Sequence, residues 1–339
     1  MKVIPLDVVG CSDIFLRAHG AGIERLPNHF KLRSFTDTNK DKLAEFGKKF
    51  HVAELYNSVE DMLKAHSDGA VLVSTPTSSH AEISIAALNA GRDVLCEKPM
   101  AMTLEEADNM IAAAKKNNRI LQLCFMSRYA PCWLKIKELL DSGEIGRVMS
   151  VSMTQYWAGS PALYKNWRTE VAASGGGIIA DSAVHWLDIL RYLNGEINSV
   201  AAAGISAFDS PFQNVDDSAL VLFKFDNGSI GLLRNSWRHR RPENEAETFE
   251  VYGEKGTILG RLHTPWVNGG VQSVRVVKAD KTVEYNFSDP MKRFANQLEV
   301  FADLIESRGA DSSSDGRRAL ELQLAIYEAM EKEIWVKTK

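Results

Sequence analysis

The sequence predicts an α/β protein with two domains, the first built on a doubly wound parallel sheet and the second on an open, mainly antiparallel sheet. The chain has 339 residues, 45% of them hydrophobic, which is enough for two cores. Up to residue 124, short apolar runs alternate with amphipathic stretches, as in βαβ units. From residue 125 onward, longer segments of alternating hydrophobicity dominate. We therefore expect one domain over 1–124 and a second over 125–339.

Five apolar runs are the expected strands of the first domain. They are Leu6–Val9, Lys31–Thr36, Ala70–Ser74, Asp93–Cys96 and Ile120–Phe125. Helix signals lie between them: Thr103 with Glu106, and Ser79 with Glu82, have the spacing of capping boxes. Gly91 is placed to end the helix that follows Ser79.

The second domain begins with a helix and continues with candidate strands. The expected strands are Val148–Tyr156, Ser199–Ala207, Ser218–Phe225, Ser229–Trp237, Glu247–Tyr252 and Val274–Val277, and the expected helices are Leu134–Leu140, Ile178–Leu193, Pro290–Ser307 and Gly316–Val336. Asp226-Asn227-Gly228 predicts a hairpin turn. An open sheet leaves one face to be polar or covered by another subunit, so we expect a homodimer or homotetramer formed through this sheet.

Charge and cysteine content exclude several classes of protein. With 40 basic and 44 acidic residues the net charge is -4, which argues against nucleic-acid binding. The four cysteines form no CxxC pair and no zinc-like spacing, so we expect reduced thiols and no metal. No apolar run reaches the roughly 20 residues of a membrane span, and the N-terminus lacks a signal-peptide core. We expect a cytoplasmic protein without a membrane partner.

A turn after the first strand is a candidate phosphate-binding loop. The segment Gly10-Cys11-Ser12-Asp13-Ile14-Phe15 keeps only one glycine of the dinucleotide fingerprint. Ser12 offers a hydroxyl to a phosphate, whereas Phe15 is bulky and Asp13 is negatively charged. The motif therefore indicates a Rossmann cofactor site at residues 10–14, with an ordinary β–α turn as the alternative.

Asp37 and the loops after the later strands support the same interpretation. Asp37, followed by Thr38, ends the second strand, where a carboxylate can bind both adenosine ribose hydroxyls and repel a 2′-phosphate. This favours NAD over NADP; a helix N-cap is the alternative for Asp37. Ligands bind at the carboxyl ends of such strands. We therefore expect two further loops to face the cofactor, Ser74-Thr75-Pro76-Thr77 and Glu97-Lys98-Pro99. Taken alone, Lys98 could equally be a solvated surface lysine.

A glycine run in the second domain precedes a helix with three polar residues. Asp181, His185 and Asp188 follow Gly175-Gly176-Gly177 at spacings i, i+4 and i+7, so they share one helix face. Burying such groups unpaired would be costly. They are either a core histidine satisfied by two aspartates, or a site in which Asp181 and His185 face a cleft and Asp188 anchors the helix. In the second case the glycines would let the backbone approach a ligand.

These motifs together resemble the Gfo/Idh/MocA oxidoreductase family, which includes glucose-fructose oxidoreductase and inositol dehydrogenase. The resemblance covers essentially the whole chain. Its elements are Gly10-Cys11, Ser74-Thr75-Pro76 with His80, Ala90-Gly91, Glu97-Lys98-Pro99, Arg128-Tyr129-Ala130-Pro131, Gly143-Glu144-Ile145-Gly146, Gly175 through Asp188, Val215-Asp216-Asp217 and Gly253 through Thr257. Ser12 and Phe15 depart from the family's glycine loop.

The resemblance implies a Rossmann domain that binds NAD, with NADP as the less favoured coenzyme, and a C-terminal domain that binds substrate and forms oligomers. It implies catalysis by Lys98, Asp181 and His185, acting on a sugar or cyclitol. The residues that it implies for the cofactor are Gly10, Cys11, Ser12, Asp13, Ile14, Asp37, Thr38, Ser74, Thr75, Pro76, Thr77, His80, Glu97, Lys98 and Arg128. Those that it implies for the substrate are Lys98, Arg128, Tyr156, Trp157, Trp167, Arg168, Asp181 and His185.

The predicted reaction is transfer of a hydride between a secondary alcohol and nicotinamide, with His185 as the base and Lys98 stabilising the charged oxygen. Asp181 would orient His185. Two other functions remain as alternatives: an NAD-dependent glycosidase that oxidises the ring transiently, and a non-catalytic sensor of a dinucleotide and a sugar.

Overall fold

The structure is a computed structural model that describes residues 2–156, 167–206, 214–239, 247–261 and 272–338. The chain forms two compact units. The first comprises Met1–Met126 and Phe294–Leu320, and the second comprises Ser127–Arg293 and Glu321–Lys339. No helix among the described residues is both long and apolar enough to cross a membrane.

The first unit contains the parallel sheet that the sequence predicts. Its described strands have the order β3-β2-β1-β4-β5-β6 and every neighbouring pair is parallel. The strands are β1 (Ile4–Val9), β2 (Phe30–Thr36), β3 (Glu54–Tyr56), β4 (Ala70–Val73), β5 (Asp93–Cys96) and β6 (Leu121–Leu123). All four residues of β4 are buried, as expected of a central parallel strand that helices cover on both faces. The predicted doubly wound sheet is confirmed.

Helices connect these strands, and their ends follow local sequence in most cases. They are α1 (Gly20–Glu24), α2 (Lys40–Phe50), α3 (Val59–Ala65), α4 (His80–Asn89) and α5 (Leu104–Asn117). The capping box of Thr103 with Glu106 is confirmed at the start of α5. The box predicted at Ser79 is wrong, because the Ser79 hydroxyl donates instead to Thr75 Oγ1 at 2.8 Å and to the Pro76 carbonyl at 2.9 Å.

A helix near the C-terminus belongs to the first unit. The chain therefore passes from one unit to the other not only near residue 124, as predicted, but also near residues 294 and 320. Helix α9 (Lys292–Ser307) contributes Leu298 and Phe301 to the core that contains Leu6 and Phe30. The rings of Phe30 and Phe301 are stacked with centroids 6.2 Å apart. This apolar packing is the physical reason why residues 294–320 associate with the parallel sheet.

The second unit contains the open sheet. The order of its described strands is β14-β13-β12-β11-β7-β10-β9-β8-β15, and only the pair β7–β10 is parallel. The strands are β7 (Val148–Tyr156), β8 (Ile197–Ile205), β9 (Ser218–Phe225), β10 (Ile230–Ser236), β11 (Glu247–Gly253), β12 (Gly256–Arg261), β13 (Gln272–Val277), β14 (Thr282–Phe287) and β15 (Val336–Lys337). The predicted mainly antiparallel sheet is confirmed.

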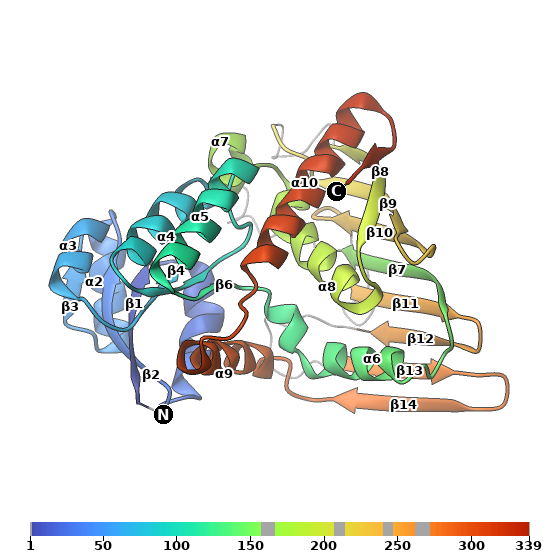
Figure 1. The fold of residues 1–339 in the computed structure, drawn as a ribbon, viewed down its shortest axis with the longest axis horizontal. Helices are drawn as coiled ribbons and strands as arrows, with labels where there is room; N and C mark the ends of the chain where they lie inside the picture. Colours follow the sequence, from blue (N-terminus) through green and yellow to red (C-terminus); the bar gives the residue numbers. More distant parts are fainter. Residues whose placement is uncertain (1, 157–166, 207–213, 240–246, 262–271, 339) are drawn as a thin grey trace. The chain divides into compact units, whose positions relative to one another are not determined.

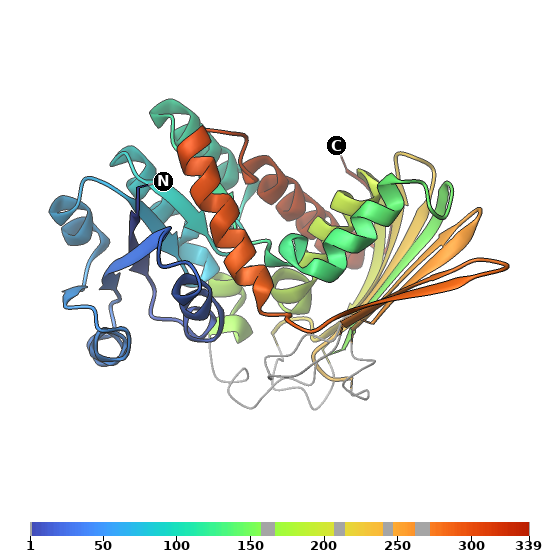
Figure 2. The ribbon, with the colours of Figure 1, turned by 90° about the horizontal axis from the view of Figure 1, so that it is seen from below.

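Helices cover one face of this sheet. Figures 1 and 2 show α6 (Pro131–Asp141) and α8 (Val184–Asn194) against the same face. Trp133 of α6 lies edge-on to Phe249 of β11, with ring centroids 4.9 Å apart. On β9, buried residues alternate with the exposed residues Leu220, Leu222 and Lys224, so the opposite face carries apolar side chains in the monomer.

One local prediction in this unit is corrected. The helix predicted over Gly316–Val336 is α10 (Ser313–Lys332), and Val336 instead pairs with Val200 as part of β15. The predicted hairpin turn at Asp226-Asn227-Gly228 is confirmed, because it joins the antiparallel strands β9 and β10, and Gly228 in it has a φ of 84°.

Candidate functional site

The turn after β1 requires glycine at its first position. Gly10 has a φ of 99°, and a Cβ built there would lie 2.8 Å from the main-chain carbon of Ser74. The Ser74 hydroxyl donates to the Gly10 carbonyl at 2.9 Å, which fastens the turn to the end of β4. This turn therefore packs main chain against main chain at the carboxyl edge of the sheet, where such folds bind dinucleotides.

Phe15, which departs from the glycine pattern, is part of the hydrophobic core of the first unit. Its side chain is fully buried, and it lies edge-on to Phe35 and Phe50 at centroid distances of 5.2 and 5.1 Å. The helix begins beside it, with Ser12 Oγ accepting the Phe15 amide at 3.3 Å. The bulk of Phe15 thus fills the space under the turn.

Asp37 lies directly beside this turn. Its Oδ2 accepts the Cys11 amide at 2.7 Å and its Oδ1 accepts the Asn39 amide at 2.8 Å. Asn39, rather than Asp37, is the N-cap of α2. A carboxylate oxygen has more than one acceptor position, so the half-buried Asp37 can still accept ribose hydroxyls. The turn and the carboxylate together fit the adenosine half of NAD.

The Cys11 thiol is not a nucleophile. Burial, followed by the charge of Asp37, raises the pKa of Cys11 to about 12, so the thiol stays protonated at neutral pH. Among the other residues predicted to bind the cofactor, Asp13 and Thr38 are exposed, Ile14, Thr75 and Pro76 are half-buried, and Thr77 is buried.

His80 links two of the predicted cofactor loops. Its ring nitrogens lie 2.7 Å from the Pro99 carbonyl and 3.0 Å from the Thr75 carbonyl. Burial lowers the pKa of His80, while the hydrogen bonds to these two carbonyls oppose the shift. His80 thereby holds the turn after β4 next to the turn after β5.

Lys98 is half-buried and follows β5 at the carboxyl edge of the sheet. The amide of Lys98 donates to Glu97 Oε2 at 3.2 Å. The other carboxylate oxygen of Glu97 lies 2.7 Å from His19 Nε2. Nothing in the sequence pattern singled out His19.

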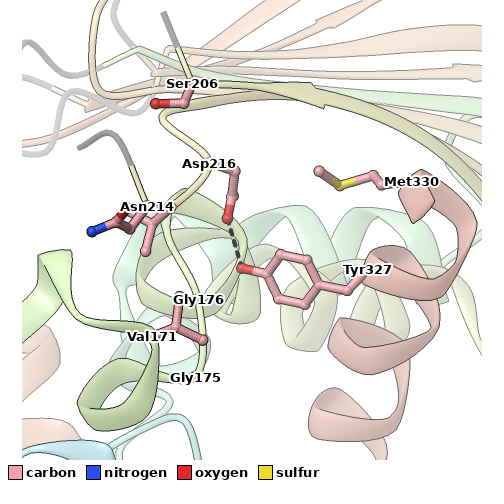
Figure 3. A pocket seen from close by; sticks show the side chains of 9 residues that line it. Val171, Gly175, Gly176, Ser206, Asn214, Asp216, Tyr327 and Met330 are labelled. Carbon is pink, nitrogen blue, oxygen red and sulfur yellow. Dashed lines mark hydrogen bonds between the residues drawn. The ribbon is translucent and has the colours of Figure 1, made fainter.

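In the second unit, the glycine run is held by Asp216. Its Oδ1 accepts the Gly177 amide at 2.9 Å, its Oδ2 accepts the Ile179 amide at 3.0 Å, and its carbonyl accepts the Ile178 amide at 2.8 Å. The Tyr327 hydroxyl donates to Asp216 Oδ1 at 2.9 Å (Figure 3). One carboxylate therefore satisfies the amides at the start of this helix, which would otherwise need a capping side chain.

Two glycines of the run are required by this packing. A Cβ at Gly176 would lie 1.9 Å from the Tyr327 hydroxyl, and one at Gly177 would lie 1.9 Å from the Asp216 carbonyl oxygen. The close neighbours of Gly176 and Gly177 are therefore Tyr327 and Asp216. Sequence reasoning missed Tyr327, which is 150 residues from Gly177.

Asp181 and His185 are carried by the segment that Asp216 anchors. The helix predicted over Ile178–Leu193 starts as a π-helical turn, Ile179–Ala183, and continues as α8. Asp181 is half-buried and accepts from Arg168 Nε at 3.2 Å. The Arg168 guanidinium lies 4.5 Å from the centroid of Trp167, and His185 is 8% exposed. Arg168 thus contacts two other predicted substrate residues, Trp167 and Asp181.

Asp188 forms an ion pair with Arg128. Arg128 donates from Nε to Oδ2 at 2.7 Å and from Nη2 to Oδ1 at 2.5 Å, and Asp188 is fully buried. The guanidinium also lies 5.2 Å from the Tyr192 ring centroid. Asp188 therefore anchors Arg128 to α8.

Of the two remaining aromatic candidates for the substrate site, the structure describes Tyr156. Tyr156, at the end of β7, packs edge-on against His239 with centroids 4.9 Å apart. Trp157 lies outside the described residues.

A pocket of about 480 Å³ lies beside the glycine run (Figure 3). Val171, Gly175, Gly176, Asp216, Tyr327 and Met330 are among the residues that line it. Among the described residues, neither Asp181 nor His185 lines this pocket.

Comparison with known proteins agrees with both units. Residues 6–125 match the model of an oxidoreductase family with an NAD-binding Rossmann fold, and residues 133–259 match a GFO/IDH/MocA C-terminal domain. The chain is 31% identical over 305 residues to a scyllo-inositol 2-dehydrogenase (NAD(+)) of Bacillus subtilis, covering 87% of this chain and 84% of that protein. It is 29% identical over 318 residues to a myo-inositol 2-dehydrogenase of Thermotoga maritima, covering 90% of each.

Among solved structures, a levoglucosan dehydrogenase in complex with NADH superimposes with a TM-score of 0.87 at 25% identity, covering 100% of both chains. The chain belongs to the Gfo/Idh/MocA family of oxidoreductases, and its N-terminal part is an NAD-binding Rossmann domain.

Proposed function

We propose that this protein is an NAD-dependent dehydrogenase that oxidises a secondary alcohol of a sugar or cyclitol, with Lys98, Asp181 and His185 as the catalytic set. The observation that carries the proposal is the anchored segment of the second unit. Asp216 holds the main chain that presents Asp181 and His185, and a site of this kind needs rigid support. The relatives named inositol and levoglucosan dehydrogenases suggest the class of substrate.

In this proposal Lys98 and His185 act on one reacting hydroxyl. Bound NAD would supply the hydride acceptor. His185 takes the hydroxyl proton, a role that suits imidazole because its ordinary pKa of about 6.5 is close to neutral. Lys98 donates to the same oxygen and stabilises its developing negative charge.

Asp181 and its neighbours would bind the substrate's other hydroxyls. Asp181 and Arg168 are paired at 3.2 Å, so they can present an acceptor and donors side by side. Trp167 lies under the Arg168 guanidinium, and an aromatic face suits the apolar C–H face of a polyol ring. Arg128 and Tyr156 complete the proposed set.

We further propose that the protein is a cytoplasmic homodimer or homotetramer that associates through the face of the second unit's sheet that lies opposite α6 and α8. Exposed apolar side chains on β9 and β10 support this association. Among them are Leu220, which is 53% exposed, and Ile230, which is 58% exposed. Large exposed apolar patches are unusual on monomers. The four cysteines are all free and buried, which is consistent with a reducing compartment.

The direct test is to screen polyols, aldoses and cyclitols for NADH formation, with NADP in parallel, in the wild type and in two variants. We expect Lys98→Ala and His185→Ala to retain NADH binding and to lose roughly 10²–10⁴-fold in turnover, because each removes a group that acts on the reacting oxygen. Lys116→Ala, an exposed lysine on α5, is the matched control and should keep full activity.

Either variant turning over at the wild-type rate would contradict the catalytic set. The product distinguishes the alternatives: stoichiometric NADH supports a dehydrogenase, whereas an aglycone released from a glycoside without net NADH would support a glycosidase.

A further inference from the structure

A buried polar cluster lies next to Lys98 in the first unit. His19 ends the helical turn after Gly10, Glu97 follows β5, and Cys124 follows β6. A side-chain nitrogen, oxygen and sulfur of the three residues lie within 4.8 Å of one another. His19 is 1%, Glu97 7% and Cys124 1% exposed, so the cluster is shielded from water.

The Glu97 carboxylate joins His19 to the main chain at Lys98. One oxygen lies 2.7 Å from His19 Nε2, and the other accepts the Lys98 amide at 3.2 Å. Because a carboxylate only accepts, Nε2 must carry the hydrogen. Nδ1 has no hydrogen-bond partner among the described residues, so this one bond fixes the polar end of the ring.

The surroundings keep water away from that bond. The ring of Phe294, from α9, lies edge-on to His19 with centroids 6.4 Å apart. Gln297 of α9 is fully buried as well. In such a dry environment a charge-assisted hydrogen bond is stronger than at the surface.

A bound metal ion is the competing explanation for these three side chains, and the thiol disfavours it. Burial, and then the charge of Glu97, raise the pKa of Cys124 well above its usual value. The thiolate, not the thiol, ligates metals, and the His19 nitrogen is already engaged by Glu97.

We propose that His19 is a positioning residue, which through Glu97 fixes the loop that aims the Lys98 ammonium at the reacting oxygen. This inference rests on the proposed function, in which Lys98 acts on that oxygen. His19 lies at the end of the helical turn Phe15–His19, which follows the turn at Gly10. Its bond to Glu97 therefore connects that helical turn with the loop that carries Lys98.

A matched pair of substitutions tests the hydrogen bond itself. Leucine at position 19 keeps an apolar side chain beside Phe294 but donates nothing, whereas the Nε2 of glutamine can replace the imidazole Nε2 as donor. We expect His19→Leu to lower kcat on the order of 10²-fold with the dissociation constant for NADH nearly unchanged, because misplacing a catalytic group by about 1 Å has this effect. The melting temperature should fall as well, because the buried Glu97 carboxylate loses this donor. His19→Gln should recover most of the rate.

A double-mutant cycle shows whether His19 acts through Lys98. In the Lys98→Ala background, His19→Leu should cause almost no further loss of kcat, because the group that it positions is already gone. Equal losses in both backgrounds, a wild-type kcat for His19→Leu, or no recovery in His19→Gln would overturn the inference. So would loss of wild-type activity on treatment with EDTA.

The outcomes separate this inference from the proposed function. If Lys98→Ala itself turns over normally, the proposed function fails. If Lys98→Ala is inactive while His19→Leu is fully active, only the role of His19 fails.

Discussion

Asp37 is the residue whose role follows most directly from sequence and structure together. Its place at the end of the second strand predicts a ribose ligand, and the structure adds its hydrogen bond to the Cys11 amide at 2.7 Å. The carboxylate therefore shapes the turn at Gly10, and its predicted second role is to set the charge that would meet the adenosine ribose.

The substitution Asp37→Asn separates these two roles. The asparagine side chain keeps an oxygen for the Cys11 amide but loses the negative charge that repels a 2′-phosphate. We expect the ratio of kcat/KM for NAD to that for NADP to fall by about 10-fold or more, since a hydrogen bond to a charged group contributes about 1.5–3 kcal/mol. An unchanged ratio, measured with both coenzymes on the same substrate, would contradict the assignment.

Residues differ in how far sequence can predict them. Gly10, Asp37 and Lys98 stand at strand ends, where topology alone gives them a common edge of the sheet. His19 has no such marker, because a histidine within a short helix is as compatible with packing as with function. Tyr327 escaped prediction because its contact with Gly177 spans 150 residues.

At the scale of elements, the segment after the glycine run is the one that sequence predicts incompletely. Periodicity predicts a helix over Ile178–Leu193, and the structure has a π-helical turn before α8. Such turns occur frequently at functional sites. The cause of the helix start is tertiary, since Asp216 supplies the acceptors for the amides of Gly177 and Ile179.

This account of the glycine run predicts graded losses in two variants. Gly177→Ala places a Cβ against the Asp216 carbonyl, so we expect it to lower stability by roughly 1–3 kcal/mol and to reduce turnover. Tyr327→Phe removes only the hydroxyl and should cost about 1 kcal/mol. Thermal unfolding followed by circular dichroism measures both, and a Gly177→Ala variant with the wild-type melting temperature would refute the steric explanation.

At the scale of the whole molecule, the sequence predicts a parallel sheet followed along the chain by a mainly antiparallel sheet. It does not predict that residues 294–320, near the C-terminus, belong to the first unit. The apolar pattern of α9 is that of any amphipathic helix, and nothing local indicates that Leu298 and Phe301 pack with Phe30. Selection of a packing partner depends on surfaces that form only when the parallel sheet is complete.

Global stability should depend on pH through Glu247 in the second unit. Burial raises the pKa of Glu247 to about 8, although the charge of Arg293 opposes the shift. A raised carboxyl pKa means that the folded protein binds a proton that the unfolded chain has released above about pH 4.5. Glu247 therefore contributes stability below the unfolded pKa, and this contribution is lost progressively as the pH rises to about 8, by at most about 1.4 kcal/mol per pH unit.

Glu247→Gln should remove this dependence, so its melting temperature should fall less than that of the wild type between pH 5.5 and 8.5. Glu250→Gln is the matched control, because Glu250 lies on the same strand but is half-buried and bonded to Tyr252. If the melting temperatures of the wild type and of Glu247→Gln fell in parallel over this pH range, the Glu247 carboxyl would not be the group responsible.

The central claim is that this chain moves a hydride from a hydroxyl-bearing carbon to NAD, and isotope transfer measures that step directly. The enzyme is incubated with NAD and a polyol, selected by the substrate screen, that carries deuterium on its ring carbons. The coenzyme product is then analysed by mass spectrometry and proton NMR. The account predicts one deuterium per reduced coenzyme at nicotinamide C4, with formation strongly slowed in His185→Ala. Reduced coenzyme without deuterium, or substrate conversion with no hydride transfer at all, would contradict it.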